Sequence, residues 1–180
     1  MLPIPATETK LAEADFFFRK LAKVGGEIVC PEPEAFGYYL SAFVSAGRSV
    51  TFALQAERKG EYDNWFPAWR ASLSDDQPSL LADFNDHRIA AVKQRGIDLS
   101  YHEEEISQSE FLFAAAREGV DIQVWGALPG SVAPTYHRRV RTLLAGGAQA
   151  EVIAAASEYL DLLKRMVDEF KSHHSGSAPS

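Results

Sequence analysis

"FGYYLSAFVSAGRSVTFAL", residues 36–54, decides the fold class of this chain. Its core-type residues recur at alternating steps of four and three positions, which is the spacing of one face of an α-helix. The face stays straight for about five turns, as packing in an antiparallel helical bundle requires. Small residues between the large ones allow close approach of another helix, from the same bundle or from a second subunit. The repeating positions are Phe36, Leu40, Phe43, Gly47, Val50 and Leu54.

The same helical spacing predicts further helices on both sides of this segment. Residues 7–24 form one of them, with Thr7 as the N-cap and Gly25 and Gly26 as the terminator. Residues 78–95 form another, and residues 148–171 form the last one. The aromatic-rich segment 60–76 between them predicts a short helix that is disturbed at a proline and covers one end of the core. The residues concerned are Trp65, Phe66, Pro67 and Trp69.

Residues 97–147 allow two interpretations. Alternation of Val120, Ile122 and Val124 with polar residues favours two strands around a turn at residues 117–119. A short helix over residues 109–118, ended by Gly119, is the alternative. Residues 136–144 read as a further strand. We therefore expect a mainly α fold: a four- or five-helix bundle with a small β-hairpin or short sheet before the C-terminal helix. The bundle should form a single domain over residues 8–171, and residues 172–180 should be a disordered tail.

Composition limits the function classes. The chain has 180 residues and a net charge of −7, which disfavours broad, non-specific binding to nucleic acid. Its positive charge is concentrated around Arg88 and over residues 138–141. The single cysteine, Cys30, excludes an internal disulfide and favours a cytoplasmic setting. No apolar stretch approaches the length of a membrane span, and no motif indicates a cofactor.

Two segments together resemble the HEPN superfamily of prokaryotic helical bundles. They are "FGYYLSAFVSAGRSVTFALQ", residues 36–55, and "FNDHRIAAVKQRG", residues 84–96. The similarity covers residues 10–100 and, more loosely, the final helix. It implies a bundle that forms a homodimer around RNA. Many members are metal-independent ribonucleases in which an arginine precedes a histidine by four to six residues.

The chemistry of that motif suits its residue types. Histidine accepts a proton near neutral pH, and arginine holds the scissile phosphate with a forked pair of donors. In this chain the arginine of the motif is Arg88, but Lys93 and Gln94 stand where the histidine would fall. A lysine is ordinarily protonated at neutral pH and is a poor base. The resemblance thus implies a catalytically degenerate module for RNA or nucleotide binding, or for dimerisation.

A metal-independent endoribonuclease of the toxin or defence type, with its histidine relocated, is the alternative function. His87 adjoins Arg88, and His102 follows Arg95 at the family spacing. The candidate catalytic residues are therefore Arg88, His87 and His102, and the candidate binding residues are Arg48, Lys93 and Arg95.

Structural roles compete with each of these assignments. Arg88 would then pair with Asp83 or Asp86, and Arg48 would pair with an acidic partner because a buried, unpaired guanidinium is costly. His87 would be a solvated helix residue. A metal site formed by His102 and the neighbouring glutamates competes with a solvated charge run, and no metal site is predicted. A third function, suggested by the resemblance, is to partner a nucleotidyltransferase or an antitoxin.

Overall fold

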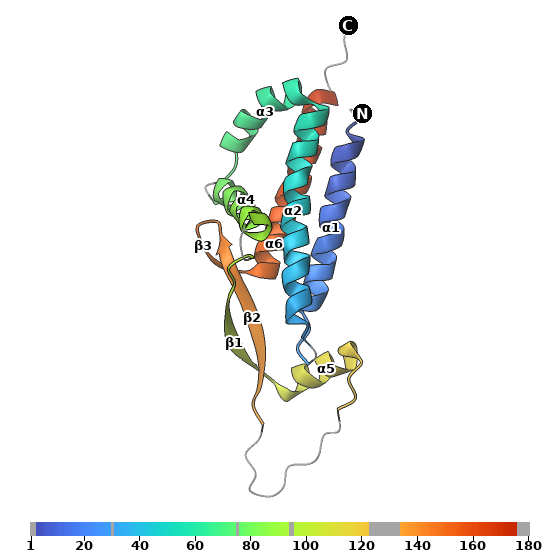
Figure 1. Ribbon diagram of the computed structural model, residues 1–180, viewed down its shortest axis with the longest axis vertical. Helices are drawn as coiled ribbons and strands as arrows, with labels where there is room; N and C mark the ends of the chain where they lie inside the picture. Colours follow the sequence, from blue (N-terminus) through green and yellow to red (C-terminus); the bar gives the residue numbers. More distant parts are fainter. Residues whose placement is uncertain (1–2, 30, 75, 94–95, 123–133, 176–180) are drawn as a thin grey trace, which may run out of the picture.

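A computed structural model describes residues 3–29, 31–74, 76–93, 96–122 and 134–175. Three long helices lie side by side along the molecule: α1 (Pro5–Gly25), α2 (Pro33–Glu57) and α6 (Val152–Ser175) (Figure 1). The positions that repeat along residues 36–54 are all buried, so α2 is the central helix that its spacing predicts. The buried side chains of these helices form one hydrophobic cluster.

Two shorter helices, α3 (Lys59–Ala71) and α4 (Gln77–Lys93), lie on the side of α2 away from α1 (Figure 1). Pro67 lies inside α3, and the helix continues through it. The expected aromatic cover of the core is confirmed. Trp65 packs edge-on against Phe170 of α6, and the indole of Trp69 donates a 2.7 Å hydrogen bond to Glu169.

Close packing of α2, α4 and α6 centres on Tyr159. Its ring stacks on Phe84 of α4 with 4.2 Å between ring centres, and it meets Phe43 of α2 edge-on. A β-carbon at Gly47 would lie 2.6 Å from Cε1 of Tyr159, which is too close for any contact between carbon atoms. The small residues of α2 therefore serve packing within the bundle at this point.

A small antiparallel sheet precedes α6. Its strands are β1 (Ser100–Ile106), β2 (Tyr136–Ala145) and β3 (Ala148–Glu151), in the order β1-β2-β3. Gly146 and Gly147 join β2 to β3 with φ of 62° and 80°, and left-handed values at both central residues suit a two-residue hairpin turn. The strand expected at residues 136–144 is confirmed, while the first residues assigned to the last helix belong to β3.

The preference for strands at residues 109–118 is wrong, because this segment forms the helix α5 (Gln108–Glu118). Ser107 accepts a hydrogen bond from the amide of Glu110, and the Glu110 carboxylate accepts one from the amide of Ser107. This reciprocal capping box starts a helix firmly. Gly119, with φ of 73°, ends it, as the helical alternative required.

A mainly α architecture with a short sheet before the C-terminal helix is thus confirmed. The described residues hold six helices, one more than the expected upper number. The last helix reaches Ser175, so residues 172–175 continue it, and residues 176–180 lie outside the described part of the chain. Within that part, no helix combines the length and the apolar character needed to cross a bilayer.

Candidate functional site: a cationic pocket between four helices

His87 and Arg88 adjoin on α4 but have different surroundings. The imidazole of His87 approaches β2, where Nε2 lies 2.6 Å from the backbone oxygen of Leu144. A carbonyl oxygen only accepts hydrogen bonds, so Nε2 carries the proton and donates it. The ring also meets Phe84 edge-on. This contact ties α4 to the sheet and gives His87 a structural role, with Nδ1 left as the only nitrogen that can accept a proton.

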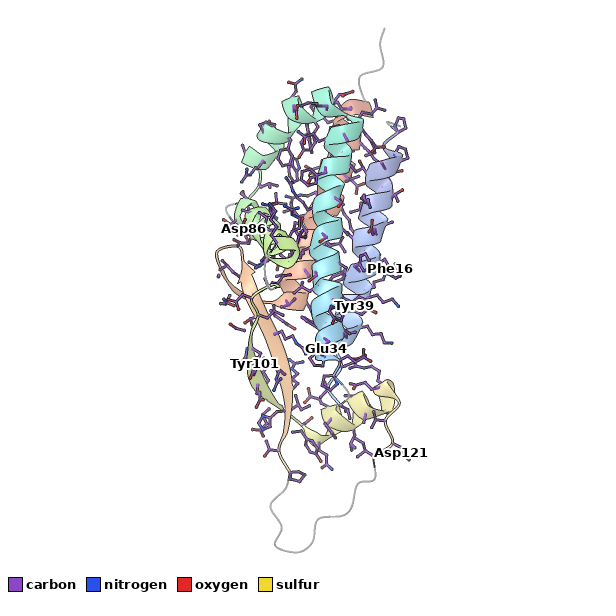
Figure 2. The ribbon with its side chains drawn as sticks, viewed as in Figure 1. Phe16, Glu34, Tyr39, Asp86, Tyr101 and Asp121 are labelled. Carbon is purple, nitrogen blue, oxygen red and sulfur yellow. The ribbon has the colours of Figure 1, made fainter. Side chains whose placement is uncertain are left out.

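Arg88 does not form the ion pair that its structural interpretation required. Asp83 accepts a 3.1 Å hydrogen bond from the amide of Gly147, and Asp86 is exposed on α4 (Figure 2). Neither carboxylate forms an ion pair with Arg88 within the described residues. Nε of Arg88 is buried and has no hydrogen-bond partner there. Arg88 is therefore half-buried, and no acidic side chain of the described residues pairs with its charge.

Arg48 on α2 is also without an acidic partner, so the expected pair is not found. Its Nη1 donates a 2.7 Å hydrogen bond to the hydroxyl of Thr51, and its guanidinium lies over the ring of Phe52 at 4.1 Å. Nε is buried and unbonded, and no ion pair of Arg48 occurs in the described ranges. This geometry agrees with the other interpretation, in which Arg48 is a binding residue, and places it at the edge of the bundle beside a pocket.

A pocket of about 290 Å³ opens beside Arg48. Four helices contribute to it, and it brings together a second guanidinium, a carboxamide and a tyrosine from α3, α4 and α6. Arg70 likewise forms no ion pair among the described residues. We call this the cationic pocket; its lining is Arg48, Thr51, Phe66, Arg70, Leu81, Ala82, Asn85 and Tyr159.

Electrostatics in the cationic pocket favour an anion. Tyr62 lies behind the lining, where it stacks on Phe66; burial raises its pKa to about 12, and the nearby positive charge of Arg48 opposes that rise. Tyr159 follows the same pattern, with burial raising its pKa and Arg48 acting against it. Both phenols are thus neutral near pH 7 and can donate hydrogen bonds. The lining contains two cations and no carboxylate, an arrangement that would stabilise a bound phosphate.

The other predicted residues lie elsewhere. His102 is on β1, with 55% of its side chain exposed, and its Nε2 lies 3.1 Å from Glu104. Glu104 also binds Arg138 at 2.6 Å, and the hydrogen bonds from Arg138 and then His102 lower its pKa. No contact joins His102 to Arg88 in the described part of the chain. Lys93 is exposed at the end of α4, and Arg95 lies outside the described residues.

Arg70, Asn85, Thr51 and Tyr159 were not singled out from the sequence. Asn85 lies three positions before Arg88, so the spacing of the helix could have drawn attention to it. Nothing in the sequence places Arg70 opposite Arg48, because that meeting depends on the angle between α2 and α3. Among the described residues, no group of three histidine, cysteine or acidic side chains is arranged to hold a metal ion.

No protein-family model matches the chain, and comparisons with curated proteins and with solved structures also gave no match.

Proposed function

We propose that this protein is a helical-bundle module of the HEPN type that binds the phosphate of a nucleotide or RNA in the cationic pocket and does not itself cleave RNA. One observation carries most weight: Arg48 and Arg70 line the same pocket and neither has a carboxylate partner among the described residues. Arg48 is half-buried, and an arginine that serves only structure is normally paired when it leaves water. Arg70 is exposed and adds a second positive charge to the lining. Two unpaired guanidiniums around one hollow are typical of phosphate recognition.

The remaining lining suits the rest of such a ligand. Asn85, Thr51 and Tyr159 offer hydrogen-bonding groups for sugar or base atoms, and Phe66 offers an aromatic face. The pocket volume of about 290 Å³ is at the small end of ligand sites, so one nucleotide unit fills it. A lack of catalysis is supported by the described lining of the pocket, which includes no histidine to act as the base.

Binding of adenosine and uridine monophosphates by calorimetry, and of a short fluorescent RNA by anisotropy, tests the proposal. A hydrogen bond to a charged group contributes about 1.5–3 kcal/mol, so Arg48→Gln and Arg70→Gln should each weaken binding by roughly ten- to a hundredfold. Arg165→Gln is the matched control, because Arg165 is exposed and bonds to Gln77 and Glu169. Equal affinity of all three variants and the unmodified protein would refute phosphate binding in this pocket.

An endoribonuclease with a relocated base is the second candidate, and the unpaired charge of Arg88 favours it. It requires Nδ1 of His87, or a histidine of a second subunit, to take the proton of the 2′-hydroxyl. Incubation of RNA with the protein in excess chelator separates the two functions. We expect intact RNA. Cleavage that disappears in both Arg88→Ala and His87→Ala would establish the enzyme instead.

Assembly and location complete the proposal. A homodimer is proposed because Phe52, which packs under Arg48 at the pocket, is 48% exposed on α2. Light scattering of the purified protein measures the oligomeric state, and Phe52→Ser should shift a dimer toward monomer.

A partner nucleotidyltransferase or antitoxin would be found by co-purification. The lone Cys30 favours a cytoplasmic location.

A further inference from the structure

A second cavity lies far along the molecule from the cationic pocket, where the connection between α1 and α2 faces β2. It consists of two adjoining hollows of about 60 and 240 Å³. The smaller hollow reaches the start of α6 at Val152, and the larger one opens between Pro33 and the sheet. Both hollows share the lining residues Glu27, Ile28, Arg138, Arg139 and Arg141.

The positive side of this cavity is Arg141. Its guanidinium lies over the ring of Phe36 at 4.3 Å, and the side chain is half-buried. Burial, and then the positive charge of Arg139, lower the pKa of Arg141. No hydrogen bond or ion pair of Arg141 occurs in the described residues. This half-buried guanidinium offers five N–H donors to a ligand in the cavity.

The negative side is Glu27, at the end of α1. Its Oε2 is buried and accepts no hydrogen bond from the described residues. Although Glu27 and Arg141 line the same two hollows, no ion pair joins them in the described ranges. A buried carboxylate oxygen without a hydrogen-bond donor is costly. The buried oxygen of Glu27 and the half-buried guanidinium of Arg141 therefore lie in one cavity and have opposite charge.

The other charges around the cavity are already compensated. Arg138 pairs with Glu104 at 2.6 Å. Arg139 approaches Glu103 at 3.7 Å and lies over the ring of Tyr101, which Figure 2 shows on β1. Glu151 lines only the smaller hollow, and its charge supports the protonated form of Arg138. Among the charged side chains that line both hollows, Arg141 and Glu27 are the two without an ion pair in the described residues.

We propose that this cavity binds a small zwitterion, a molecule that carries both a carboxylate and an ammonium group, such as a free α-amino acid. The carboxylate would accept hydrogen bonds from Arg141, and the ammonium group would donate to Glu27. A simple anion would satisfy Arg141 but leave Glu27 desolvated beside another negative charge. A simple cation would pair with Glu27 but leave Arg141 beside another positive charge. Only a ligand with both charges complements both groups, and this site does not depend on the phosphate-binding function.

The size of the cavity agrees with this ligand. A cavity needs about 10–15 Å³ to hold one water. The smaller hollow therefore has room for a few waters or for the charged end of a small molecule. The larger hollow can take a side chain. Its walls include Pro31 and Pro33 as well as charged groups, so a short apolar side chain has a surface to contact.

Calorimetric titration of the full chain with glycine and L-alanine tests this inference. The matched half-ligands are acetate, methylammonium and an equimolar mixture of the two. We expect saturable binding of the amino acids and at least tenfold weaker binding of every half-ligand. Equal binding of acetate and glycine, or no saturation by either amino acid at about 10 mM, where weak ligands are already detectable, would overturn the proposal. These comparisons use the unmodified protein and do not depend on any variant folding.

Variants then locate the site. Glu27→Gln keeps the shape of the side chain and removes its charge. Arg141→Lys keeps the positive charge but removes the paired N–H donors of the guanidinium. Each should weaken glycine binding by tenfold or more. Arg19→Gln, at an exposed residue paired with Asp15 on α1, should leave it unchanged. A direct Glu27–Arg141 pair is the competing explanation. Strong coupling of the Glu27→Gln and Arg141→Gln stabilities without ligand would show that pair and refute the zwitterion site.

Discussion

Glu57, at the end of α2, caps the beginning of α1. Its carboxylate accepts hydrogen bonds from the amides of Ala6 and Thr7 at 2.8 and 2.9 Å, and from the hydroxyl of Thr7 at 2.7 Å. No side chain next to the helix start supplies a cap, so an acid about fifty residues away satisfies the exposed amides. Burial alone would raise the pKa of Glu57, but the hydrogen bonds from Thr7 and from the amides outweigh it and lower the pKa overall.

The pH dependence of stability follows from that direction. A carboxyl whose pKa is lower in the folded state stabilises the fold above its unfolded pKa of about 4.3, and this contribution is lost as the pH falls through the folded pKa. Glu57→Gln should therefore reduce stability by about 1–2 kcal/mol near neutral pH and by less in acid. Urea unfolding at several pH values measures it. A loss that is the same at about pH 3 and pH 7 would contradict the role of the charge.

At the scale of elements, two glycines on α2 have opposite roles. Gly47 faces α6, where an added β-carbon would meet Tyr159 at 2.6 Å. Gly37 lies on the same helix with nothing within 4 Å of an added β-carbon. The requirement for glycine at position 47 therefore comes from packing between helices, since both positions have ordinary helical backbone.

Alanine at each position should separate packing from helix propensity. Gly47→Ala should destabilise the protein by about 1–3 kcal/mol, because the rings of Tyr159 and Phe84 must move. Gly37→Ala should stabilise it by about 0.5–1 kcal/mol, because alanine loses less backbone freedom in a helix. Thermal unfolding of the two variants provides the measurement. Stabilisation by both substitutions would show that α2 and α6 are not packed as closely as the structure has them.

Two side chains of the small helix α5 connect it to the bundle: Arg117 donates a hydrogen bond to the backbone oxygen of Gly26, and Glu118 contributes a buried carboxylate. Glu118, whose side chain is 6% exposed, accepts hydrogen bonds from the amides of Ile28 and Val29 at 2.7 and 2.9 Å. The contact connects α5 to the turn between α1 and α2, far away in sequence. Local stability of this region should depend on it, because a lost partner leaves two amides unsatisfied.

Hydrogen exchange tests this attachment. In Glu118→Ala the amides of Ile28 and Val29 should exchange faster, by roughly ten- to a hundredfold for a loss of about 1.5–3 kcal/mol in local stability. Glu105→Ala is a suitable control, because Glu105 is exposed on β1. Amide exchange in the middle of α2 should not change. Unchanged protection of Ile28 and Val29 would indicate that other contacts fix α5.

The elements that sequence reasoning predicted well are those whose burial repeats with one period. The buried residues of α2 recur at steps of three and four positions, so a single pattern predicts the helix. The strand prediction for residues 108–118 was wrong because it relied on the alternation just beyond them, at Val120 and Ile122. The capping signal of Ser107 and Glu110, which indicates a helix, received too little weight. The residues of the candidate site differ in the same way in how far the sequence predicts them. Arg48 was recognisable as a charge within an apolar seam, whereas Arg70 and Asn85 acquire meaning only when α3 and α4 fold onto α2.

The whole molecule carries a net charge of −7, and this limits how it can hold RNA. Overall repulsion opposes a polyanion, so attraction must come from the local field of the cationic pocket. A protein that follows an RNA backbone through many arginines and lysines releases many counterions. In the pocket, only Arg48 and Arg70 are positioned to contact phosphates. The salt dependence of binding counts those contacts.

Two phosphate contacts with single-stranded RNA predict a slope of log K against log salt of about −1.4, so affinity should fall about sevenfold for a fourfold rise in salt. Arg48→Gln should bring the slope to about −0.7, because one contact is lost. Anisotropy titrations of a short RNA across a salt series measure both slopes, with Arg165→Gln as the control that keeps the steeper value. A slope near −4 or beyond would mean that RNA follows a longer basic surface, such as the arginines of β2, and that the cationic pocket does not dominate binding.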